Sequence, residues 1–127
     1  MLRMSPIQME AFAQMVKVSF AERMVRELLR DFPRELRSHG IVDAEAVRQL
    51  VQRGIEEAAQ NAVLLERDAY LYLQCMALFG AQFPHAEASA WAAEILSRSD
   101  ISGTAKMDLI HDHLVFGSTP GLPGEQP

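Results

Sequence analysis

The sequence predicts an all-α protein, a single compact bundle of about five helices around a central buried helix. Good helix formers (Ala, Leu, Met, Glu, Gln and Arg) dominate the 127 residues, whereas the β-branched and aromatic runs typical of strands are scarce. A chain of this length is enough for one hydrophobic core but not for two. Residues 66–80 (ERDAYLYLQCMALFG) are apolar on nearly every side after a charged opening, as expected for a helix against which its neighbours pack.

The first predicted helix begins at Ser5 and Pro6 and continues to about residue 30 or 31. Ser5 can cap it, Pro6 suits the first helical position, and Gln8 can complete a capping box. Pro33 ends the helix, because the residue before a proline is disfavoured in helical geometry. Its apolar stripe recurs every four positions, at Phe12, Val16, Phe20, Met24 and Leu28.

Three further helices are predicted around the central one. A short helical turn over residues 34–39 precedes a helix that Asp43 caps and that continues to about residue 61. Gly54 inside it costs about 1 kcal/mol relative to alanine, and either a close helix–helix approach or chance explains it. The last two helices occupy about residues 86–97 and 104–116.

The ends of these helices are predicted from single residues. Gly80 is expected to form a left-handed cap at the end of the central helix. Ser102 or Thr104 is expected to cap the last one. Residues 1–116 then form the helical domain. Residues 117–127, rich in glycine and proline, are expected to form a flexible tail.

The net charge of −5 argues against a general nucleic-acid-binding protein, which normally carries a basic surface. Residues 1–63 hold nine basic and nine acidic side chains, so the whole imbalance lies in residues 64–127. Two interpretations remain open: the acidic residues solvate the outer helix faces, or they form an acidic face that meets a basic partner.

Several classes of protein receive no support from the sequence. The single cysteine, Cys75, excludes an internal disulfide and fits a reducing compartment. No signal peptide is recognised, and the longest apolar stretch is about half the roughly 20 residues that a membrane span requires. We therefore expect a cytoplasmic protein that interacts with neither membrane nor nucleic acid.

No motif predicts catalysis, a metal site or a cofactor. His111 and His113 are two residues apart on a helix and point to different sides, so they cannot easily share one metal ion. No glycine-rich phosphate loop precedes a helix, and no serine or cysteine lies in a nucleophile motif. Tyr70 and Tyr72 could line a ligand cavity, although a buried tyrosine usually needs only one hydroxyl partner.

An ordered set of residues resembles a family of small helical bacterial proteins encoded beside type VI secretion genes, near spike proteins, PAAR-tipped effectors and their adaptor chaperones. The similarity covers roughly residues 10 to 115 and departs from the family at residues 61–63 and 85–90. The residues that carry it are Phe20, Arg23, Met24, Val25, Leu28, Phe32, Pro33, Arg53, Gly54, Ile55, Glu66, Arg67, Asp68, Tyr72, Leu73, Met76, Phe79, Gly80, Phe83, Trp91, Ala92, Ile95 and Leu96.

The resemblance implies a non-catalytic accessory chaperone or co-chaperone that binds a secretion effector or its adaptor. The runner-up is an immunity protein that neutralises a toxin, and a third class is a small ligand-binding bundle. A surplus of apolar stripe on the first helix would form a docking groove or a homodimer seam. The residues expected to contact a partner are Met15, Arg23, Arg26, Glu66, Arg67 and Asp68.

Overall fold

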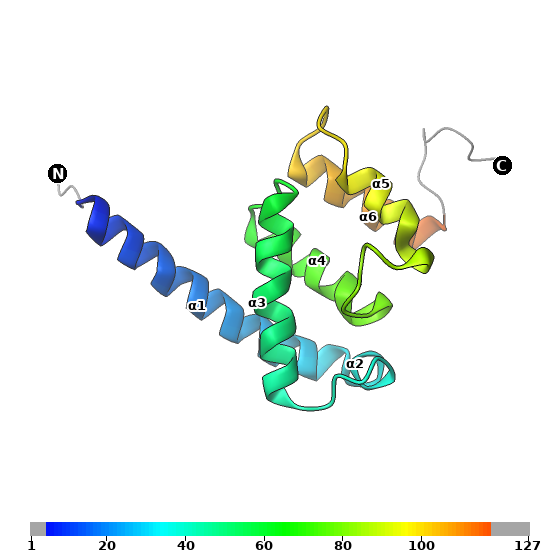
Figure 1. The fold of residues 1–127 in the computed structure, drawn as a ribbon, viewed down its shortest axis with the longest axis horizontal. Coiled ribbons are helices and arrows are strands. Elements are labelled where there is room, and N and C mark those ends of the chain that lie inside the picture. Colours follow the sequence, from blue (N-terminus) through cyan, green and yellow to red (C-terminus); the bar gives the residue numbers. More distant parts are fainter. Residues whose placement is uncertain (1–4, 118–127) are drawn as a thin grey trace.

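The computed structural model describes residues 5–117, without the side chains of residues 6–14 and 16. Over this range the protein is all-helical, as predicted, and contains no strand (Figure 1). One short 3-10 helix, η1 (Glu87–Ser89), precedes α5. The six α-helices are α1 (Pro6–Asp31), α2 (Pro33–Ser38), α3 (Ala44–Gln60), α4 (Glu66–Phe79), α5 (Ala90–Leu96) and α6 (Gly103–Phe116).

The centre of the fold is α4, which contacts α1, α2, α3 and α6. This confirms that the apolar stretch predicted from the sequence is the helix around which the others pack. Tyr72, Leu73, Cys75 and Met76 are fully buried within it. Aromatic rings continue outward from this core, through Phe83, Phe79 and Trp91 to a stack of Trp91 on His113 at 3.7 Å between ring centroids.

Helix α1 is only partly covered by the rest of the molecule. Its C-terminal half packs on α3 and α4 through Phe20, Met24, Val25 and Leu28, all buried. The N-terminal half extends beyond the other helices, as the dark blue end of the ribbon in Figure 1 shows. At about 1.5 Å per residue the whole helix is about 39 Å long, so its free end stands well clear of the core.

The predicted helix caps are confirmed at Asp43 and Ser102. Asp43 accepts a hydrogen bond from the Ala46 amide at 2.7 Å, and Ser102 accepts one from the Ala105 amide at 3.1 Å. Gly80 has the positive φ that the prediction required, 98°. Its ψ of 168° lies outside the left-handed helical region, so the predicted left-handed cap is wrong in this respect.

Two elements differ from their predicted bounds, and the first of them, the short turn predicted over residues 34–39, is α2 (Pro33–Ser38) and begins one residue earlier. Pro33 both ends α1 and occupies the first turn of α2, where its missing amide hydrogen costs nothing. The helix predicted over residues 86–97 is an α-helix only from Ala90 to Leu96. The Ser89 hydroxyl donates to the Ala86 carbonyl at 3.2 Å, a local hydrogen bond that favours the 3-10 turn over a longer helix.

Gly54 allows α3 and α4 to approach closely. An added Cβ at this position would collide with the side chain of Leu73 and lie 2.7 Å from the Met76 sulfur. Of the two explanations left open by the sequence, the structure therefore supports the close helix–helix approach. The missing side chain gives α4 the space to bury these two residues.

The first turn of α6 packs against the link between α3 and α4, residues 61–65, and against the first turn of α4. The Thr104 hydroxyl donates to the Asp68 carboxylate at 2.6 Å, and the Lys106 ammonium donates to the Asn61 carbonyl at 3.0 Å. Both Asp68 and Lys106 are almost fully buried. Such hydrogen bonds to buried charged groups are among the stronger ones in proteins, and they fix α6 on the core.

Gly103 makes the same junction possible at the level of the backbone. An added Cβ at this residue would overlap the Ala62 carbonyl oxygen and lie 3.0 Å from the Val63 Cα. Ala62 itself has a positive φ of 65°, which turns the chain out of α3. We call the contacts of Gly103, Thr104 and Lys106 with Ala62, Asp68 and Asn61 the α6 latch.

Two further expectations concern the C-terminal tail and the absence of a membrane-spanning helix. The flexible tail predicted from residue 117 onward lies almost wholly outside the described residues. Within the described part, no helix has both the length and the apolar character needed to cross a membrane.

Candidate interaction surface

The structure joins two of the predicted contact residues directly. The Arg23 guanidinium of α1 donates to the Glu66 carboxylate of α4 at 2.8 Å, and both side chains are about half exposed. Arg23 also lies over the Phe20 ring, 5.4 Å from its centroid. An exposed ion pair of this kind contributes only about 0–1 kcal/mol to stability. Both charges are accessible to a partner because their side chains are about half exposed.

Two exposed leucines extend this pair into a larger surface. Leu64 and Leu65 directly precede Glu66, and they are 76% and 57% exposed. The Arg67 side chain beside them is also largely exposed. We call Arg23, Leu64, Leu65, Glu66 and Arg67 the α4-head patch, because they surround the first turn of α4.

Asp68 belongs beneath this patch rather than in it. Its side chain is 3% exposed and accepts the hydrogen bond of Thr104 in the α6 latch. The sequence indicated Asp68 as a contact residue from charge placement alone, because it lies at the charged head of the central helix. Here the partner is internal, so Asp68 supports the surface and does not present its carboxylate to another protein.

The other two predicted residues lie elsewhere along α1. Met15 is 68% exposed on the half of the helix that extends from the body. Arg26 lies beside Glu22, Val25 and Arg48, on the side of α1 that faces α3. Neither belongs to the α4-head patch, but Arg26 borders a second surface, on the helix where the sequence suggested a docking groove or a homodimer seam without naming the residues that line it.

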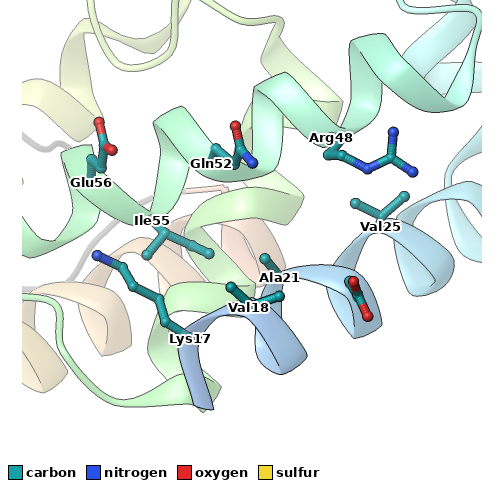
Figure 2. Close-up of a pocket in the computed structure, with 9 residues that line it drawn as sticks. Lys17, Val18, Ala21, Val25, Arg48, Gln52, Ile55 and Glu56 are labelled. Atoms are coloured by element: carbon teal, nitrogen blue, oxygen red, sulfur yellow. The ribbon is translucent and has the colours of Figure 1, made fainter. Parts of the chain in front are cut away.

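This second surface is an open groove between α1 and α3, with a volume of about 280 Å³ (Figure 2). Its floor is apolar and its rim carries two basic and two acidic side chains. We call it the α1–α3 groove. The floor is formed by Val18, Ala21, Val25 and Ile55, and the rim by Lys17, Glu22, Arg48, Gln52 and Glu56.

The spacing of Val18, Ala21 and Val25 could have indicated this groove. These residues recur every three or four positions, as expected for one face of a helix. Val18 and Ala21 lie beside the stripe that enters the core, and Val25 belongs to both, since it is 6% exposed and packs in the core. The stronger stripe at Phe20, Met24 and Leu28 dominated the sequence pattern.

The two tyrosines that the sequence suggested as cavity-lining residues each donate a hydrogen bond to a carboxylate of another helix. The Tyr72 hydroxyl donates to the Glu57 carboxylate at 3.2 Å, and burial raises the pKa of Tyr72. Tyr70 donates to the Asp31 carboxylate at 3.4 Å. Among the described residues, no three His, Cys, Asp or Glu side chains gather as a metal ion would require.

Cys75 should be almost unreactive in the folded protein. Burial raises the pKa of its thiol to about 12, so only about one molecule in ten thousand carries the thiolate at pH 8. Since the thiolate is the nucleophile, we expect an aromatic disulfide reagent to label native Cys75 at least about 100-fold more slowly than the urea-unfolded chain. The measurement is absorbance of the released thiol at pH 8. Equal rates in the two states would show that Cys75 is open to solvent.

No family model, curated protein or solved structure matches this chain. The two surfaces described above are therefore the features from which a function can be proposed. Both surfaces combine exposed apolar side chains with interspersed charges.

Proposed function

We propose that this protein is a non-catalytic interaction module that holds a partner protein at the α4-head patch. The observation that carries this proposal is the exposure of Leu64 and Leu65 beside the Arg23–Glu66 pair. Contiguous exposed apolar side chains rimmed by charges are typical of binding surfaces. The leucines would fill a partner's apolar pocket, while the flanking charges select its orientation.

The specific role that we propose is an accessory chaperone for a type VI secretion effector or its adaptor. This part depends on the resemblance to small helical proteins of secretion gene clusters. The protein would mask an apolar or basic surface of the effector before loading. The α4-head patch itself carries Arg23 and Arg67 against Glu66, so it suits an apolar partner surface better than a basic one, and most of the acidic residues of positions 64–127 lie outside it.

The partner can be identified by purifying the tagged protein from its own bacterium and analysing co-purified proteins by mass spectrometry. Recovery of a secretion effector or its adaptor in near-equal amount supports the chaperone role. Co-expression with the effector's toxic domain then separates two roles. A chaperone raises effector solubility without blocking its activity, whereas rescue of the cells would assign an immunity role instead. A protein that purifies without any partner contradicts the proposal.

Replacing Leu64 by aspartate should reduce partner recovery at least tenfold, about 1.4 kcal/mol of binding free energy. The side chain is exposed, so the change should leave the fold intact while placing a charge in the apolar contact. Recovery is measured in the same pull-down, with circular dichroism as the test of folding. The matched control is Val42→Asp, a substitution at another exposed apolar position, 69% exposed, in the loop between α2 and α3.

The charges of the patch can be tested without breaking their ion pair. The exchange Arg23→Glu with Glu66→Arg restores an oppositely charged pair but inverts the charge pattern. Loss of the partner in this double variant, with an unchanged unfolding midpoint, supports recognition by charge. Full recovery of the partner from both this variant and Leu64→Asp would remove the α4-head patch as the binding surface.

A further inference from the structure

We infer that the α1–α3 groove binds the extended half of α1 from a second copy of this chain, so that two copies form a symmetric dimer. This inference goes beyond the proposed function and does not depend on it. It concerns a different surface from the α4-head patch. It rests on two features of α1: the groove beside its residues 17–25 and its extended N-terminal half.

The groove is an apolar surface that the protein's own helices leave open. Its floor includes Val18, which is 56% exposed, and Ile55, which is only partly buried. In Figure 2 these two side chains point into the space between α1 and α3. A helix laid along this groove would cover its floor, the way an amphipathic helix binds an apolar groove.

The extended half of α1 has the composition of a helix that becomes buried. Residues 6–16 read PIQMEAFAQMV, in which seven of eleven residues are apolar besides the proline and one is charged. A helix apolar on most sides is normally covered by other structure. The rest of α1 is packed against the body, whereas this half extends beyond the other helices, so contact with a second copy would stabilise it.

The groove and its proposed occupant have the same length along α1. The groove lies along α1 from Lys17 to Val25, which is nine residues or about 13 Å of helix. An antiparallel arrangement with its two-fold axis near residue 16 places residues 7–15 of the second copy beside this stretch. Since the same helix supplies the groove and the occupant, the contact forms twice. A two-fold symmetric interface requires this reciprocity.

The charges of the groove favour the second copy over a strongly charged partner. The rim holds Lys17 and Arg48 against Glu22 and Glu56, a balance of zero. Residues 6–16 carry a single charge, so the occupant brings little repulsion or desolvation cost. A basic or acidic peptide would meet like charges on the rim as often as opposite ones, and would gain little.

The inference is tested on the purified protein alone, by light scattering coupled to size-exclusion chromatography over a range of concentrations. We expect a dimer, and we expect Val18→Asp to weaken its association at least tenfold with unchanged helix content. Val42→Asp, the matched exposed control, should remain dimeric. A monomer at every concentration would overturn the inference, and so would a dimer that Val18→Asp leaves intact.

A cross-linking experiment gives a second, independent measurement. Val18→Cys lies near the proposed axis, so a short bis-maleimide should join two copies through it. Val42→Cys should remain uncrosslinked, and the buried native Cys75 should not interfere. Equal cross-linking of both variants would contradict the proposed register. Because no partner is present, failure here leaves the pull-down result untouched, and failure of the pull-down leaves this one untouched.

Discussion

Replacing Gly103 by alanine should destabilise the protein by about 3 kcal/mol or more, at the upper end of the usual cost of overpacking a core. The added Cβ would overlap the Ala62 carbonyl oxygen and press on the Val63 Cα. Both contacts are backbone, so no side-chain rotation can relieve them. The first turn of α6 would have to withdraw from the link between α3 and α4, and the α6 latch would loosen.

Thermal unfolding followed by circular dichroism measures this effect, with an expected fall in Tm of roughly 10 °C for a chain of this size. Gly54→Ala is the matched control. Its Cβ would meet only the flexible ends of Leu73 and Met76, and alanine is a better helix former by about 1 kcal/mol. Leu73 and Met76 are fully buried and must shift to admit the Cβ, so we expect this control to cost about 0–2 kcal/mol, less than Gly103→Ala. Similar Tm values for the parent and Gly103→Ala would contradict the close backbone contact.

Replacing Asp68 by alanine should cost about 2–3 kcal/mol of unfolding free energy. The substitution removes a charge-assisted hydrogen bond worth about 1.5–3 kcal/mol. It also removes a negative charge from the positive end of α4, worth up to about 1 kcal/mol. Because the Thr104 hydroxyl loses its acceptor, α6 is held less firmly on the core.

Urea unfolding measures the loss, and Glu66→Ala is the control. Glu66 is an acidic residue of the same helical turn, but its ion pair is exposed, so its removal should cost no more than about 1 kcal/mol. A double-mutant cycle with Thr104→Val isolates the hydrogen bond, and we expect a coupling of about 1 kcal/mol or more. Equal losses for Asp68→Ala and Glu66→Ala would show that burial of Asp68 has no energetic consequence.

The helices and most of their ends could be predicted from the sequence because their causes are local. The four-residue recurrence of Phe20, Met24 and Leu28 identifies the buried face of α1 without knowledge of any other element. Asp43 caps α3 through an amide three residues away. Such signals require only neighbouring residues, and the structure confirms them.

The surfaces could not be predicted in the same way, because they depend on residues far apart in the chain. Arg23 and Glu66 are 43 positions apart, and the sequence marked each as a contact residue without indicating that they meet. Asp68 looked like a surface carboxylate until the position of α6 was known. Leu64 and Leu65 lie in a link without helical periodicity, so no pattern indicated their exposure.

The aromatic stack, which lies across the molecule from the free end of α1 (Figure 1), has a practical consequence for spectroscopy. Trp91 is the single tryptophan, and its ring lies between Phe79 of α4 and His113 of α6. Its intrinsic fluorescence therefore reports on the junction of α4, α5 and α6 rather than on α1. The protein contains its own optical probe for the packing of α6. Dimer formation through α1 is measured separately, by the light scattering and cross-linking described above.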